Sequence, residues 1–261
     1  MALPRMIVNA DDFGISNTVN RAILESMEIG LVTSTSIMAN MPGFEDALTL
    51  VHEHPILTGR IGVHLNLTEG HPLSVPILDC PTFCNDNGRF VYDRQRSLFS
   101  LTRKGKDAVY EEMRTQLERV LAAGIEPTHL DSHHHLHTEW AIAPLVCRLG
   151  REYGIPRVRL ARNMGQPSSL AKRVYKTIFN RWRLGNRRDF RNTDYFGDIE
   201  DMKIFLRRHN PGSKSIEIMV HPLFDSEGGL VDLDRQNLYR QLGTILEKQP
   251  ALCPSPTDPL Q

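Results

Sequence analysis

Histidine and aspartate gather in a few short stretches of this 261-residue chain, and the densest stretch lies at residues 129–137. It reads His-Leu-Asp-Ser-His-His-His-Leu-His, so that five of nine positions are histidine. A polar surface segment is the simplest alternative, but imidazole is the commonest protein ligand for catalytic transition metals. So many histidines are also poor packing material for a core. The stretch therefore predicts a metal site.

Aspartate and histidine also occur at three other places in the chain that are candidates for the same chemistry. Asp11 and Asp12 stand side by side near the N-terminus, and His64 and His221 each lie at or near the end of an apolar run. Each alone has a simpler interpretation, such as a turn that caps a helix or a histidine buried in a core. Adjacent buried carboxylates repel unless a cation or a proton compensates them. Four predicted strands that each end in aspartate or histidine therefore indicate one shared site.

The histidine-rich stretch leaves two ways to choose a ligand pair. His133 and His137 are four residues apart and could bind a metal together on a helix, which would leave His64 as a substrate contact. The pattern at 128–132 instead predicts a strand, which makes His133 the first residue after it. We therefore favour His64 and His133 as the pair.

The chain around these residues alternates between strand-like and helix-like periodicity. Strands are predicted at 5–10, 31–39, 60–67, 128–132, 157–160 and 216–220. Helices are predicted at about 16–30, 44–51, 108–123, 142–153 and 236–247. Such alternation predicts parallel βαβ units, with an α/β barrel as the first choice and a doubly wound open sheet as the second. In both architectures, sites form at the carboxyl ends of the strands.

Two stretches interrupt this alternation within a single predicted barrel domain spanning 1–261. Residues 70–107 are rich in Pro, Asn, Asp and Gly and are predicted to form a loop insertion. Residues 162–191 are basic, with Tyr175 and Trp182 among the cations. We interpret this basic stretch as a solvated insertion helix, and a lid over an anionic or sugar substrate is the alternative.

Composition excludes several classes of protein. Lysine and arginine together equal aspartate and glutamate at 31 each, so no global field favours nucleic acid or an anionic membrane. No apolar run approaches the roughly 20 residues that span a bilayer, and no secretory signal begins the sequence. Four scattered cysteines, Cys80, Cys84, Cys147 and Cys253, make no disulfide framework. A cytoplasmic protein is expected.

The residues permit one mechanism in outline. One aspartate and two histidines from separate strands would hold a metal and leave positions open for water and substrate. Such a metal can lower the pKa of water and polarise a carbonyl. The second carboxylate of the Asp pair could then act as the base, and a separate histidine could protonate the leaving group. This inventory fits hydrolysis of an amide or an ester.

Four segments together resemble the YdjC-like carbohydrate deacetylases, a group that includes chitooligosaccharide deacetylases and a hopanoid-pathway branch. They are Val-Asn-Ala-Asp-Asp-Phe-Gly at 8–14, Gly-Leu-Val-Thr-Ser-Thr-Ser at 30–36, Gly-Val-His-Leu-Asn-Leu-Thr at 62–68 and Pro-Thr-His-Leu-Asp-Ser-His-His-His at 127–135. The resemblance covers about residues 5 to 250.

The resemblance implies a distorted TIM-like (β/α) barrel of the polysaccharide-deacetylase type, which removes an acetyl group from an N-acetylated sugar. Carried over by position, Asp12, His64 and His133 would bind the metal. Asp11 would be the general base and His221 the general acid. The family implies Mg²⁺, whereas a histidine-rich site also suits Zn²⁺ or another transition ion.

Further expectations concern the substrate and the assembly. Arg159 would orient Asp11 or contact the substrate. His134, His135 and His137 would support the ligands or face the substrate. The expected partner is a small carbohydrate, and a homodimer fits this kind of barrel. Neither 70–107 nor 162–191 matches a chitobiose-specific pattern, so the acetylated sugar stays open.

Two other functions compete with this one. A metal-dependent phosphoesterase or amidohydrolase could use a related barrel, usually with more ligands and often with two metals. A sugar-binding protein could keep the barrel without catalysis. Against the second alternative, all five proposed catalytic and metal positions hold competent residues.

Overall fold

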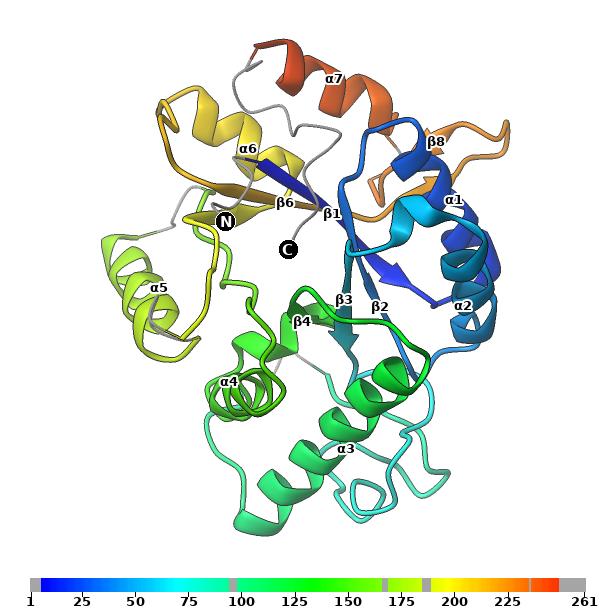
Figure 1. Cartoon of the computed structure of the whole chain (residues 1–261). Coiled ribbons are helices and arrows are strands. Elements are labelled where there is room, and N and C mark those ends of the chain that lie inside the picture. The colour runs from blue at the N-terminus through cyan, green and yellow to red at the C-terminus, as the bar shows by residue number, and fades with distance from the viewer. Residues whose placement is uncertain (1–5, 94–97, 166–168, 185–188, 235, 249–261) are drawn as a thin grey trace.

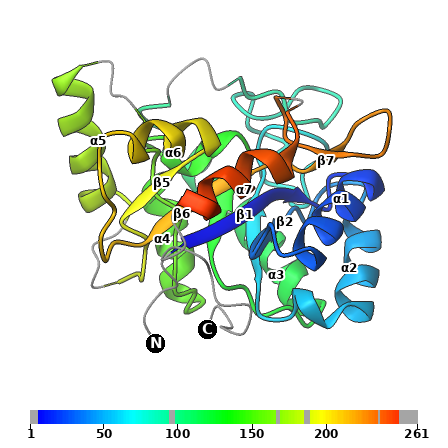
Figure 2. The same cartoon turned by 90° about the horizontal axis from the view of Figure 1, so that it is seen from above.

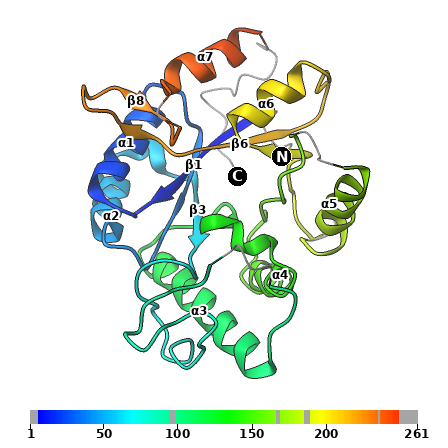
Figure 3. The same cartoon turned by 180° about the vertical axis from the view of Figure 1, so that it is seen from behind.

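Strands and helices alternate along the chain, and the helices surround the strands (Figure 1; Figure 3). The computed structural model describes residues 6–93, 98–165, 169–184, 189–234 and 236–248. The strands are β1 (Met6–Phe13), β2 (Ser34–Ile37), β3 (Ile61–Leu65), β4 (Leu130–Ser132), β5 (Tyr195–Gly197), β6 (Ile216–Val220), β7 (Leu223–Phe224) and β8 (Leu230–Val231). The α-helices are α1 (Asn17–Glu28), α2 (Phe44–Glu53), α3 (Arg103–Ala122), α4 (Ala143–Glu152), α5 (Leu170–Trp182), α6 (Ile199–Leu206) and α7 (Leu238–Lys248). Two 3-10 turns are η1 (Pro55–Leu57) and η2 (His133–Thr138).

Six of these strands form one parallel sheet in the order β4-β3-β2-β1-β6-β5. The segment at 157–164 joins its two outer strands. On the β4 side, Arg159 N donates to Leu130 O over 2.9 Å, and on the β5 side, Asn163 N donates to Phe196 O over 3.0 Å. The sheet therefore curls back toward itself, which confirms the predicted α/β barrel in a distorted form and not the open doubly wound sheet.

Most predicted elements are present, with shifted ends. Ser16 caps α1 as predicted, its side chain accepting from Val19 N over 3.3 Å. The predicted strand at 157–160 is wrong as a regular strand, because it makes a single parallel bridge, from Val158 to Leu130. α3 begins at Arg103, so the end of the predicted 70–107 loop is helical.

Several predictions fall partly outside the described residues. These are Arg5 at the start of the first strand, Arg187 and Arg188 in the basic stretch, and Cys253. The elements η1, η2, β5, α6 and the β7–β8 hairpin were not predicted, because each is too short to carry a clear periodicity. No helix among the described residues is long and apolar enough to cross a membrane.

A bulge in β1 turns two neighbouring aspartates toward the same site. The pairing of β1 with β2 shifts between Ala10 and Phe13, so that β1 carries one extra residue there. Asp12, within this shift, has a φ of 71°. In a regular strand Asp11 and Asp12 would point to opposite faces, but a bulge can re-aim a side chain, and aspartate tolerates the left-handed conformation. The strand thus extends through both aspartates, beyond the predicted end at residue 10.

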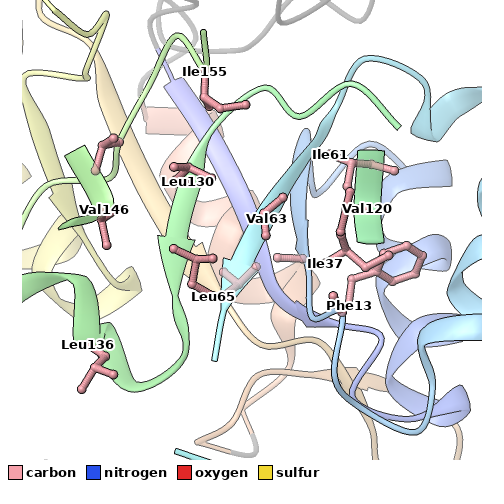
Figure 4. Packing of buried hydrophobic residues seen from close by; sticks show 14 of the residues in the cluster. Phe13, Ile37, Ile61, Val63, Leu65, Val120, Leu130, Leu136, Val146 and Ile155 are labelled. Carbon is pink, nitrogen blue, oxygen red and sulfur yellow. The ribbon is translucent and has the colours of Figure 1, made fainter. Parts of the chain in front are cut away.

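The alternation of side chains along the strands divides the core from the site. Val63 and Leu65 of β3 belong to the hydrophobic core, which also takes in Val120 of α3 and Val146 of α4 (Figure 4). His64, between them, points to the other face, into the barrel. The same strand places apolar side chains toward the helices and a polar one toward the interior.

Gly62 keeps space for a buried ring inside the barrel. A Cβ on Gly62 would lie 2.4 Å from the His129 ring, which is itself 4% exposed. Burial and the neighbouring Arg157 hold the pKa of His129 well below its usual value, so this ring is neutral. Only glycine permits this approach, because Thr128 Oγ1 and Arg157 Nη2 hold the ring in place, at 2.9 and 3.4 Å from His129 Nδ1.

We expect Gly62→Ala to lower the free energy of unfolding by about 1–3 kcal/mol, because the added methyl group overpacks the barrel interior. The matched control is Gly243→Ala in α7, where a Cβ would meet nothing within 4 Å. That change should stabilise the protein by about 0.5–1 kcal/mol, since alanine favours a helix interior over glycine. Urea unfolding of both variants measures the two effects. Equal effects would contradict the steric role of Gly62.

Candidate active site

Three side chains from three strands converge at the carboxyl end of the barrel. Asp12 lies near the end of β1, His64 lies in β3, and His133 directly follows β4. Asp12 Oδ1 lies 2.8 Å from His133 Nδ1 and 3.2 Å from His64 Nε2. One ligand atom from each residue lies within 4.8 Å of the other two. One carboxylate and two imidazoles suit a divalent metal with positions left for water and substrate.

Asp131 holds the far side of the His64 ring. His64 Nδ1 lies 2.8 Å from Asp131 Oδ1, and Ser36 donates to Asp131 Oδ2 over 2.9 Å. A carboxylate on the second ring nitrogen fixes the tautomer and orientation of a ligating histidine. This contact therefore turns Nε2 toward Asp12.

A fully buried arginine ties three carboxylates together. Arg159 contacts both oxygens of Asp11, with Nη1 to Oδ2 at 2.6 Å and Nη2 to Oδ1 at 2.7 Å. It also lies 2.8 Å from Asp131 Oδ2 and donates from Nε to Glu217 Oε1 over 2.6 Å. Of the two roles expected for Arg159, orienting Asp11 agrees with this geometry.

The electrostatics of the site favour a cation. Burial alone would raise the pKa of Asp12, but hydrogen bonds from His133 and His64 hold it well below its usual value. Burial alone would lower the pKa of His64, yet the charge of Asp131 and the hydrogen bond to Asp12 raise it to about 10. The negative charge around these rings thus attracts a proton when no metal is present. The residues fit a divalent ion, which would take the place of such protons.

Glu69 approaches the same cluster from the loop after β3. Its Oε1 lies 3.4 Å from His133 Nε2 and 3.8 Å from His134 Nε2, so these three residues form a second possible cluster. Asn66 shapes the loop, its Oδ1 accepting from Thr68 N and Glu69 N over 3.0 and 3.1 Å. A further cluster contains Asp11, His64 and Asp131. It suits a metal less well, because both of its carboxylates already contact Arg159.

His221 follows β6 at the same end of the barrel. Val220 pairs with Ala10 across the sheet, so His221 and Asp11 come next on neighbouring strands. The His221 side chain is 25% exposed, and its Nδ1 lies 3.9 Å from Asp232 Oδ1. Asp232 also accepts from His221 N over 2.7 Å, which fixes this residue to the β7–β8 hairpin.

The remaining histidines of the dense stretch separate into exposed and buried ones. His134 and His135 have φ values of 51° and 53°, so η2 is not a regular helix. His134 is half exposed and lies 3.1 Å from Thr68 Oγ1. His137 is fully buried and lies 2.7 Å from Ser132 Oγ. The metal-type clusters among the described residues do not include His137, so the alternative His133–His137 pair has no support here.

Sequence reasoning assigned no role to three residues that shape this site. Asp131, Glu69 and Glu217 each contact a proposed ligand or the arginine behind the proposed base. The signal for Asp131 was its period-two spacing from His133. Glu217 had a comparable signal, because an acidic residue inside an apolar strand must be paired when buried. Glu69 lies in a loop, where residue spacing does not predict which way a side chain points.

Comparison with known proteins supports a family assignment for most of the chain. The family model described as YdjC-like protein matches residues 5–248. A carbohydrate deacetylase of Brevibacillus brevis is 37% identical over 87% of this chain and 84% of its own length. A carbohydrate deacetylase of Halalkalibacterium halodurans is 33% identical over 85% and 86%. A chitooligosaccharide deacetylase of Serratia marcescens is 33% identical over 84% and 81%.

A solved structure agrees with the fold. It is an Enterococcus faecalis V583 protein described as a candidate for cellobiose-phosphate cleavage, with a TM-score of 0.69 and 24% identity. The match covers 95% of this chain and 94% of that one. With the family model matched over nearly the whole length and the barrel shared, this chain belongs to the YdjC-like family.

Proposed function

We propose that this protein is a metal-dependent carbohydrate deacetylase, which hydrolyses the N-acetyl group of an acetylated saccharide. The observation that carries the proposal is the cluster of Asp12, His64 and His133 next to a second, arginine-bound carboxylate. The names of the Brevibacillus brevis and Serratia marcescens relatives support the substrate class.

Asp12, His64 and His133 would hold one divalent ion, which when bound lowers the pKa of water and polarises the amide carbonyl. The family resemblance implies Mg²⁺, and the two imidazoles also suit Zn²⁺ or another transition ion. Asp131 contributes by holding His64 Nδ1, so that Nε2 keeps its direction.

Asp11 is the proposed general base. Its carboxylate would accept the proton of the attacking water, while Arg159 keeps both oxygens oriented at 2.6 and 2.7 Å. Asn9 also donates to Asp11 Oδ1 over 2.9 Å. The adjacent Asp12 is a proposed metal ligand, so the two neighbouring aspartates have different proposed roles.

His221 is the proposed general acid. It would donate a proton to the amide nitrogen as the carbon–nitrogen bond breaks, which releases acetate and a free amine. Asp232 holds its backbone, and Asp232 Oδ1 lies 3.9 Å from the Nδ1 of its ring.

We expect Asp11→Asn to retain the metal and to lose nearly all deacetylation, because an amide cannot accept the proton. Acetate release from N-acetylglucosamine oligomers and metal content by mass spectrometry measure the two properties. Glu217→Gln is the matched control, since Glu217 accepts from the same guanidinium over 2.6 Å and is not the proposed base. An equal loss of activity in the control would assign the effect to Arg159 and not to proton transfer.

We expect His221→Ala to lower kcat by about 10² or more, a typical contribution of acid–base catalysis, with KM nearly unchanged. Steady-state kinetics on the same oligomers measure this. The control is His52→Ala, at an exposed position of α2, which should match the native protein. Native kcat in the His221 variant would remove this residue from the mechanism.

We expect one tightly held divalent ion per chain, lost in His64→Ala and in His133→Ala. A phosphoesterase with two metals is the competing function, and it would need the Glu69–His133–His134 cluster as its second site. Equilibrium dialysis followed by mass spectrometry counts the ions, and Glu69→Gln should leave the count at one. Two ions per native chain, with one lost in the Glu69 variant, would favour the competing function.

A further inference from the structure

The helix α5 turns an apolar face outward, away from the barrel. Leu170, Val174, Ile178 and Trp182 follow one another at intervals of four residues and are 75%, 48%, 49% and 78% exposed. Phe179, on the opposite face, is 2% exposed and packs toward the barrel. We call these four outward residues the α5 stripe. A helix on a globular protein normally buries its apolar face, so this arrangement needs a separate explanation.

Apolar exposure is concentrated at this place. Twelve large hydrophobic residues are exposed in the described part of the chain, and five of them are the α5 stripe and Tyr175. Phe99 is 70% exposed and lines the same cavity as Tyr175, so the apolar surface extends past the helix. Figure 1 and Figure 2 show α5 at the periphery of the molecule, where a flat surface can reach it. Contiguous exposed apolar surface commonly marks an interaction site.

The surroundings of the stripe are positively charged, although lysine and arginine equal aspartate and glutamate over the whole chain. The helix contains no aspartate or glutamate, and residues 162–191 contain a single acidic residue, Asp189. Lys172 and Arg181 are exposed on α5 itself. Burial and the neighbouring charges of Arg162 and Lys172 lower the pKa of Lys176 and outweigh the opposite effect of Asp201.

These features decide between possible occupants. A second copy related by a two-fold axis would bring stripe against stripe and the flanking cations against one another. A basic helix with an apolar face and a terminal tryptophan instead matches helices that lie flat in the membrane interface. We propose that α5 docks this protein on the surface of an anionic lipid bilayer, with the α5 stripe in the interface and the lysines and arginines on the headgroups.

The size of the helix fits a flat orientation. Thirteen residues span about 20 Å, too short to cross a bilayer but sufficient to lie along it. Beneath α5 is a cavity of about 350 Å³, lined by Trp140, Tyr175 and Phe179 among others, which reaches His135. His135 is two residues from the proposed ligand His133. Docking through α5 would therefore bring the catalytic end of the barrel near the bilayer.

Co-sedimentation of the full chain with vesicles tests this proposal. We expect binding to phosphatidylcholine vesicles that contain one-third phosphatidylglycerol, weak binding to phosphatidylcholine alone, and loss of binding at high salt. Ile178→Ser with Trp182→Ser should weaken binding about ten-fold or more, because it removes apolar contact with the interface. Lys172→Glu with Arg181→Glu should weaken it to a similar extent, because it removes attraction to the headgroups.

The matched control is Val75→Ser with Leu233→Ser, which changes two residues that are 77% and 64% exposed outside α5. It should bind as the native chain does, and circular dichroism should show all variants folded. The proposal is overturned if the native chain does not sediment with anionic vesicles, or if both α5 variants bind like the control. Binding to soluble polyglutamate but not to vesicles would also overturn it, as would a dimer in sedimentation velocity that the stripe variant dissociates.

Discussion

The guanidinium of Arg159 is the interaction on which the interior of this barrel depends. It contacts Asp11 from β1, Asp131 from β4 and Glu217 from β6, and none of its own surface is exposed. Three buried carboxylates would repel one another strongly without a cation between them. The arginine lies between the three carboxylates, compensates part of their charge and links the three strands. The same contacts orient the proposed base and, through Asp131, the ring of a proposed metal ligand.

Local backbone distortions also orient side chains of the proposed site. The bulge at the end of β1 brings Asp12 to the same side as Asp11, and His134 and His135 adopt left-handed conformations directly after the proposed ligand His133. Non-glycine residues rarely adopt such conformations, and they cluster where function requires a particular direction of a side chain. In this protein they occur only within the proposed site, among the described residues. The barrel therefore supports the site, and the residues with strained backbone set the direction of its side chains.

The basic segment and the site are connected through the inner face of α5. The outward face of α5 does not pack against the barrel. The inner face lines a cavity that reaches the histidine-rich turn. Trp140, which lies shortly after η2, stacks with Tyr175 of α5 and lies under Arg183, which follows the helix. The outer face of α5 can therefore contact an external surface while its inner face lines the cavity next to the site. The insertion helix predicted within 162–191 corresponds to α5, whose outward side carries exposed apolar residues as well as the exposed Lys172 and Arg181.

The alternation of strand and helix patterns, the caps and the aspartates and histidines at strand ends can all be read from the sequence. They depend on local periodicity and turn chemistry, and they suffice for the barrel and for the residues gathered at its carboxyl end. Other features depend on contacts between residues far apart in the chain. The His64–Asp131 contact, the three partners of Arg159 and the ring that excludes a side chain at Gly62 arise only when the strands are in register. Periodicity also cannot tell which face of α5 points inward, because an apolar stripe looks the same whether it meets a core or an external surface.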